Sequence, residues 1–152
     1  MIRRAGAAVC AALCVAMAGP AAAACLAVVA RPEGTTLATV DAIDGFRIAY
    51  VHSVTRTPVV ETYRVDADAF VQTAIRFSEH GPGLPTQSDE GGRFLRVGNA
   101  FVMTMQRRFD SIAMRIHADQ SPVLVAGDRS VQLAAWGNRS LALVRSPSCA
   151  AH

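Results

Sequence analysis

The sequence predicts an all-β protein of one domain, folded as an antiparallel sandwich or a partly open barrel of short strands. Apolar and polar residues alternate with a period of two along almost the whole chain, and no stretch of three or more helical turns competes with this pattern. Glycine, proline, asparagine and aspartate recur between the alternating segments, as short turns require. Many short strands joined by short turns favour a sandwich or a barrel.

Each alternating segment is bounded by turn-forming residues, and we expect each to form a strand. In chain order the expected strands cover residues 26–31, 36–40, 46–53, 59–66, 70–79, 93–97, 100–106, 113–117, 123–126, 131–134 and 141–145. The turns between them include Pro32-Glu33-Gly34, Asp44-Gly45, Gly98-Asn99, Gly127-Asp128 and Gly137-Asn138. The Gly98-Asn99 pair suits a two-residue hairpin, which would set Val97 opposite Ala100 and Leu95 opposite Val102.

The first 24 residues have the order of a secretory signal peptide. A short basic start is followed by an apolar run without charge, a Gly19-Pro20 break and small residues before Cys25, so we expect cleavage after Ala24. The mature domain would then span residues 25–152 and be periplasmic or otherwise exported. Two alternatives stay open: an uncleaved membrane anchor formed by residues 5–30, or a lipid-modified Cys25. Either would tie the protein to a membrane.

Cleavage would leave two cysteines, Cys25 and Cys149, near the two ends of the mature chain. In an oxidising compartment such a pair more often forms a disulfide than stays free, and we expect one that joins the first and last strands. The whole chain has 15 Lys plus Arg against 12 Asp plus Glu, and the leader removes Arg3 and Arg4, which leaves 13 against 12. A nearly neutral domain gives no electrostatic case for nucleic-acid binding.

A histidine and a glutamate occupy what the alternation predicts to be an apolar strand face. His52 follows Tyr50 on one strand, and Glu61 lies beside Tyr63 on the next. With a tight turn at Arg56-Thr57, matching of the buried faces would set His52 opposite Glu61 and Tyr50 opposite Tyr63. The pair would then be a general base, a metal ligand with its partner, or an anchor for a ligand's polar group. The alternative is a buried polar pair that only fixes the strand register.

One loop, residues 80–92, is longer than the others and holds four glycines and two prolines. Such loops are often functional, although a mobile surface excursion is an equal alternative. We expect it to fold over the end of the sheet that carries the polar pair, which makes Gly81 and Gly83 candidate ligand-binding residues. His80, at its entrance, would complete a metal site with His52 and Glu61 if a metal binds. We expect no cofactor, and without a G-x-S-x-G motif serine hydrolysis has little support.

Several segments together resemble a known family. The residues are Tyr50-x-His52-Ser53-Val54, Thr57-Pro58-Val59 with Glu61 and Tyr63, and Phe77 followed by Gly81-x-Gly83-Leu84-Pro85. They are similar to the bacterial domain-of-unknown-function 1850 family. Pro82 departs from the pattern, since a small residue is common there.

Members of that family are often encoded beside TAXI-type tripartite ATP-independent periplasmic (TRAP) transporters, which import small organic acids. The resemblance therefore implies an exported accessory protein, whose partner would be a transporter component or its organic-acid solute. We expect a domain that binds rather than catalyses, with Tyr50, His52, Glu61 and Tyr63 at its site. A periplasmic hydrolase that uses a metal, or the histidine and glutamate, is the alternative.

Overall fold

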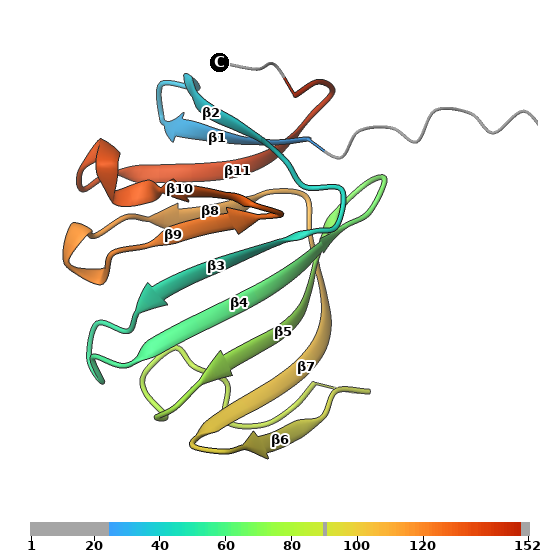
Figure 1. The fold of residues 1–152 in the computed structure, drawn as a ribbon, viewed down its shortest axis with the longest axis vertical. Helices are drawn as coiled ribbons and strands as arrows, with labels where there is room; N and C mark the ends of the chain where they lie inside the picture. Colours follow the sequence, from blue (N-terminus) through green and yellow to red (C-terminus); the bar gives the residue numbers. More distant parts are fainter. Residues whose placement is uncertain (1–24, 90, 150–152) are drawn as a thin grey trace, which may run out of the picture.

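The computed structural model describes residues 25–89 and 91–149, which form two antiparallel β-sheets (Figure 1). The four-stranded sheet has the order β2-β1-β11-β8, with bounds Thr36–Asp41, Cys25–Arg31, Ser140–Ser146 and Ile112–Arg115. The seven-stranded sheet has the order β10-β9-β3-β4-β5-β7-β6, with bounds Arg129–Gln132, Val123–Ala126, Phe46–Val51, Pro58–Val65, Phe70–Phe77, Ala100–Phe109 and Phe94–Val97. Two 3₁₀ turns, η1 (Ala118–Gln120) and η2 (Leu133–Trp136), flank strands β9 and β10. The expected all-β sandwich is confirmed, and the leader expected at residues 1–24 lies outside the described residues.

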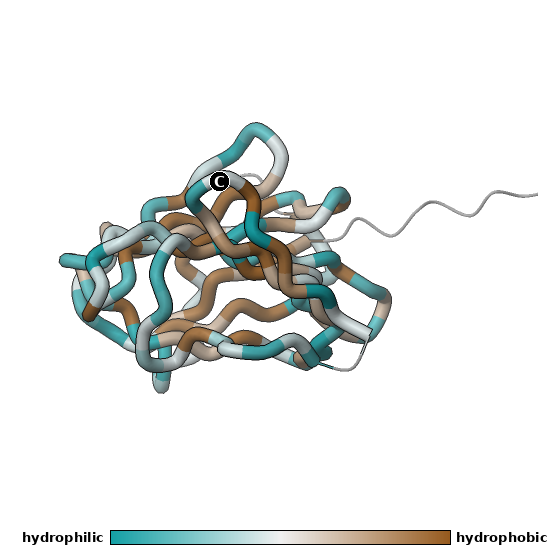
Figure 2. Tube along the Cα trace, turned by 90° about the horizontal axis from the view of Figure 1, so that it is seen from below, coloured by the Kyte–Doolittle hydropathy of each residue, from teal (hydrophilic) through white to brown (hydrophobic). Residues whose placement is uncertain are grey.

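The two sheets pack together through the apolar face of each strand. Leu26 and Val28 of β1 and Leu141 of β11 belong to the same buried cluster as Phe46 and Leu124 of the other sheet. Figure 2 shows hydrophobic segments running through the middle of the molecule, with hydrophilic segments in the surrounding loops. Burial of these large aliphatic and aromatic side chains is the main driving force for the fold.

A second apolar cluster covers the part of the seven-stranded sheet formed by β4, β5 and β7. Val59, Phe77 and Met103 are almost fully buried there, and Leu84 reaches them from the long loop between β5 and β6. Tyr50 packs against both clusters and therefore lies where they meet. The long loop thus covers one half of the seven-stranded sheet, while the four-stranded sheet covers the other.

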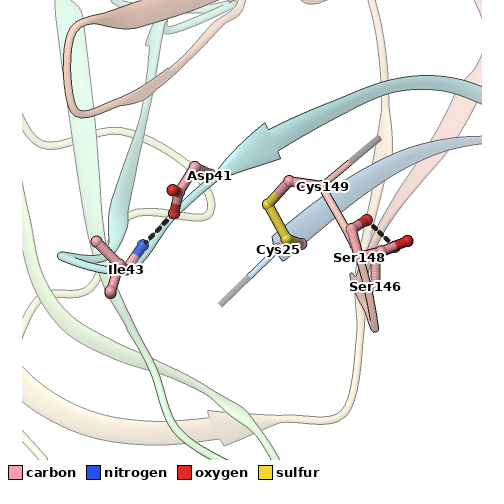
Figure 3. Close-up of a disulfide and its surroundings, with 6 residues drawn as sticks. All are labelled: Cys25, Asp41, Ile43, Ser146, Ser148 and Cys149. Atoms are coloured by element: carbon pink, nitrogen blue, oxygen red, sulfur yellow. Dashed lines mark hydrogen bonds between the residues drawn. A yellow bond between two sulfur atoms is a disulfide. The ribbon is translucent and has the colours of Figure 1, made fainter. Parts of the chain in front are cut away.

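A disulfide between Cys25 and Cys149 joins the two ends of the described chain (Figure 3). Strands β1 and β11 are hydrogen-bonded neighbours, with Cys25 opposite Ser146, so both predictions about the termini are confirmed. The Cα atoms of the two cysteines lie 5.3 Å apart, within the usual range for a disulfide. The bridge closes a sequence separation of 124 residues and therefore restricts the unfolded chain strongly.

Most of the local predictions are confirmed. Each expected segment contains a strand, and the β6–β7 hairpin pairs Val97 with Ala100 and Leu95 with Val102 as expected. The prediction for residues 131–134 is partly wrong, because β10 ends at Gln132 and Leu133 begins the 3₁₀ turn η2. Leu133 is fully buried. Its apolar side chain therefore fits the alternation of a strand, although its backbone lies in a 3₁₀ turn.

The predicted register of the β3–β4 hairpin is wrong. Ile48, rather than His52, faces Glu61, and Phe46 faces Tyr63. A shift by four residues leaves every side chain on its expected face, so matching of buried faces does not distinguish the two registers. The actual loop spans residues 52–57, and it is closed by hydrogen bonds from the His52 N–H to the Thr57 carbonyl and from the Arg56 N–H to the His52 carbonyl. Arg56 adopts a left-handed conformation (φ 58°) that lets this wider loop form.

Candidate ligand-binding site

Glu61 lies on the inner face of β4, where it is half-buried between two tyrosines. Tyr63 is two residues further along the same strand, and Tyr50 is the diagonal neighbour on β3, since Ile48 is directly opposite. The Tyr50 hydroxyl donates a hydrogen bond of 3.0 Å to Glu61 Oε1, and the Tyr63 hydroxyl donates one of 2.6 Å to Oε2. The two phenols therefore hold both oxygens of the Glu61 side chain in place.

Local packing fixes Tyr63, whose hydrogen bond to Glu61 is the shorter of the two. The Tyr63 ring stacks on Phe46, with centroids 4.9 Å apart and planes 8° from parallel. The Tyr63 carbonyl lies so close to Gly45 that a Cβ there would clash with it, and Gly45 has a φ of +88°. Only glycine suits both conditions. The short turn before β3 thus sets the position of Tyr63, and through it that of Glu61.

Burial raises the pKa of both tyrosines above the ordinary value near 10, and the negative charge and hydrogen bond of Glu61 raise it further. Both phenols therefore stay protonated through the neutral and mildly alkaline range and remain hydrogen-bond donors. No ion pair joins Glu61 to any basic residue in the described part of the chain. The two phenols are thus its hydrogen-bond partners, and no described basic side chain pairs with it.

A cavity of about 230 Å³ opens beside Glu61, between the two sheets. Ile48, Tyr50 and Glu61 form one wall. The other wall comes from strand β8 and the segment after it, namely Ile112, Ala113, Met114, Arg115, Ile116, Gln120 and Pro122. Pockets for drug-sized ligands measure about 300–1,000 Å³, so this one suits a smaller molecule. The lining combines apolar side chains with polar ones, and Glu61 is its acidic residue while Arg115 is its basic one.

His52 does not pair with Glu61, which corrects the sequence-based hypothesis. Its Nδ1 accepts the backbone N–H groups of Val54 (3.3 Å) and Thr55 (3.2 Å), so Nε2 carries the proton and donates to the Pro82 carbonyl at 3.0 Å. Because Ile48 is the residue opposite Glu61, the His52 backbone lies four residues further along, about 13 Å at the rise of a strand. The buried His52 organises its own loop and anchors the long one.

The long loop packs against this histidine through a glycine. A Cβ on Gly81 would lie 2.7 Å from His52 Cε1 and 3.0 Å from Thr55 Cγ2, so only a residue without a side chain fits. Gly83 differs, since it has a φ of +84° and nothing within 4 Å of an added Cβ. Gly81 is therefore needed for close packing and Gly83 for a turn conformation.

The third residue of the conditional metal site lies among aromatic rings. The His80 ring is 5.1 Å from that of Phe77, 4.8 Å from Phe101 and 5.9 Å from Phe94. Among the described residues, no three His, Cys, Asp or Glu side chains lie close enough together to hold a metal ion. The structure therefore does not bring His52, Glu61 and His80 together as one ligand set.

The predicted site residues thus fall into two groups. Tyr50, Glu61 and Tyr63 meet at the cavity, whereas His52 and Gly81 meet at the anchored loop. Sequence reasoning missed the opposite wall of the cavity, because strand β8 belongs to the other sheet. Its alternation predicted a strand, but nothing local indicated which strand it would face.

The fold and the site define a small two-sheet β-sandwich with an acidic, tyrosine-lined cavity between its sheets. Residues 46–133 match the family model described as Domain of unknown function (DUF1850), and the chain belongs to this family. The matched segment includes both walls of the cavity and the anchored loop. No curated protein and no solved structure matches the chain. Within the described residues, no helix has the length and apolar character needed to cross a bilayer.

Proposed function

We propose that the protein is a non-catalytic binding domain that holds a small ligand in the cavity beside Glu61. The observation that carries this proposal is a half-buried carboxylate, fixed by two phenols, on the wall of a cavity that also offers apolar side chains. An ionised carboxylate has about four acceptor positions, of which the tyrosines use two. The other two are available to a donor on a ligand.

Glu61 selects the end of the ligand that lies beside it. Glu61 attracts an ammonium or hydroxyl group and repels a carboxylate, while Ile48, Met114 and Ile116 offer an apolar surface to the rest of the molecule. We infer that the ligand carries a hydrogen-bond donor on a short apolar body. A small organic acid would enter this cavity only through a hydroxyl or amino group, with its carboxylate directed away from Glu61.

The hydrogen bonds of His52 favour binding over catalysis. Both ring nitrogens of His52 are engaged by backbone groups, and no side chain in the described residues uses it as a relay to Glu61. A hydrolase built on these two residues needs them within hydrogen-bond reach of one substrate. Their separation along the strand, about 13 Å at the backbone, removes that arrangement.

The physiological part of the proposal is that this domain is an exported accessory of a TAXI-type TRAP solute-uptake system. Its support is membership of the DUF1850 family, for which the resemblance implies an association with such transporters, and a disulfide that suits an oxidising compartment. Affinity purification of the protein from its own periplasm tests this role. Retention of a transporter component is expected, and its consistent absence, together with the absence of a transporter gene nearby, would contradict the role.

Calorimetric titration tests the ligand chemistry, with n-pentylamine, 1-pentanol and pentanoate as probes of similar size at neutral pH. We expect the amine to bind best and pentanoate not to bind. Glu61→Gln should weaken amine binding at least tenfold, because the amide retains the shape but not the charge. Glu79→Gln, at an exposed position outside the cavity, is the matched control. Equal binding by the Glu61→Gln variant, or binding of none of the probes, would contradict the proposal.

A further inference from the structure

A second group of polar residues lies in one row across the four-stranded sheet. Arg31 of β1 faces Ser140 of β11, and Ser140 in turn faces Arg115 of β8. Directly opposed residues of antiparallel strands point to the same side of the sheet. The row therefore places a hydroxyl between two guanidinium groups on one face.

This face is the outer one. The preceding row, formed by Ala30, Leu141 and Met114, belongs to the core or packs against it. Because side chains alternate along a strand, the arginine row points away from the other sheet. Arg31 and Arg115 are exposed, so a solute can reach them directly.

The row borders a surface hollow of about 470 Å³, larger than the inner cavity. Arg31, Ser140 and Arg115 line it together with Pro32 and Ala113. Two inter-strand spacings separate the backbones of the two arginines, about 10 Å. The flexible arginine side chains can therefore turn toward each other above Ser140 and grip one small molecule from two sides.

The described residues that line this hollow include two arginines and no acidic side chain. No ion pair involves Arg31 or Arg115 within the described part of the chain. Glu33, in the turn after β1, pairs instead with Arg139 at 3.5 Å. By contrast, Arg107 and Arg108 at the end of β7 each pair with aspartates.

We propose that Arg31, Ser140 and Arg115 form a binding site for a small oxyanion, carried by a carboxylate or a phosphate group. A guanidinium presents parallel N–H donors whose spacing matches the oxygens of both groups, and the serine hydroxyl adds a donor between them. The site adjoins the Glu61 cavity, and Arg115 lines both hollows. Strand β8 forms part of the wall of both hollows.

The experiment is an NMR titration of the disulfide-bonded protein with inorganic phosphate and, separately, with malonate, in dilute buffer. Sodium chloride at equal ionic strength shows how much of any change is general screening. We expect saturable shifts centred on the backbone amides of Arg31, Ser140 and Arg115. Stronger binding of malonate assigns the site to carboxylates, and stronger binding of phosphate assigns it to phosphate groups.

The double variant Arg31→Gln, Arg115→Gln should lower the affinity for the better probe at least tenfold. Arg47→Gln is the matched control, because Arg47 is an exposed arginine of β3 without an ion pair to a described residue. It should change the affinity less than twofold. An equal loss in the Arg47→Gln variant, or no saturation by either probe, would overturn the proposal. If the protein binds an anion but not n-pentylamine, the result would uphold the arginine site and contradict only the proposed site at Glu61.

Discussion

Removal of the Tyr63 hydroxyl tests how firmly the protein holds Glu61. Tyr63→Phe deletes the donor of a 2.6 Å hydrogen bond to a carboxylate, at a ring that is only 4% exposed. Hydrogen bonds to charged groups contribute about 1.5–3 kcal/mol, so we expect the free energy of unfolding to fall by that amount. The phenylalanine ring keeps the stacking on Phe46, which confines the change to the hydroxyl. Urea denaturation followed by circular dichroism measures the loss.

A double-mutant cycle with Glu61→Gln separates the hydrogen bond from other effects of the substitution. In the Glu61→Gln background the partner is neutral, and Tyr63→Phe should cost only about 0.5–1.5 kcal/mol. Tyr50→Phe should cost less than Tyr63→Phe, because its hydrogen bond is longer, at 3.0 Å, and Tyr50 is more exposed. An equal cost of Tyr63→Phe in both backgrounds, or a cost below about 0.5 kcal/mol in the wild type, would refute the reasoning.

Three further predictions concern the ionisation of the two tyrosines, the disulfide and the packing of Gly81 against His52. Tyr50 and Tyr63 are the two tyrosines of the chain, and with their raised pKa values the folded protein should show little phenolate absorbance at pH 11. Unfolded tyrosines ionise near pH 10, so the contribution of the two tyrosines to stability should be constant below that pH. Above it, stability should fall by about 1.4 kcal/mol per pH unit for each tyrosine, and full ionisation of native protein at pH 10.5 would contradict this. Reduction of the Cys25–Cys149 disulfide should lower the free energy of unfolding by about 4–5 kcal/mol in the chain-entropy model, and an unchanged urea midpoint would argue against it. Gly81→Ala should destabilise the protein by about 1–3 kcal/mol through its clash with His52. In the His52→Ala variant, Gly81→Ala should cost much less. If the costs of the two substitutions simply add in the double variant, the contact is disproved.

The strands could be predicted because their signals are local. Alternation located each one, and the Gly98-Asn99 pair fixed the register of its hairpin, since two-residue turns allow few geometries. The disulfide followed from two cysteines at the ends of one domain. In each case the residues that decide the structure are neighbours in sequence or chemically unique.

The β3–β4 register depended on information that the alternation does not carry. Two registers differing by four residues bury the same faces, and the choice between them lies in the His52 side chain, which accepts two backbone N–H groups and widens the loop. Strand β8 lies opposite Glu61 across the cavity, and this position depends on how the two sheets pack. Such contacts arise between residues far apart in sequence, so no local pattern predicts them.

Methyl NMR during a titration with n-pentylamine shows whether the cavity beside Glu61 receives a ligand. The methyl groups of Ile48, Ile112 and Met114 line the cavity and should shift together with one dissociation constant. Those of Ile75 and Met103 belong to the second apolar cluster and should stay unchanged. Saturable shifts confined to the first set are the predicted result; unchanged spectra, or equal shifts in both sets, would contradict the claim.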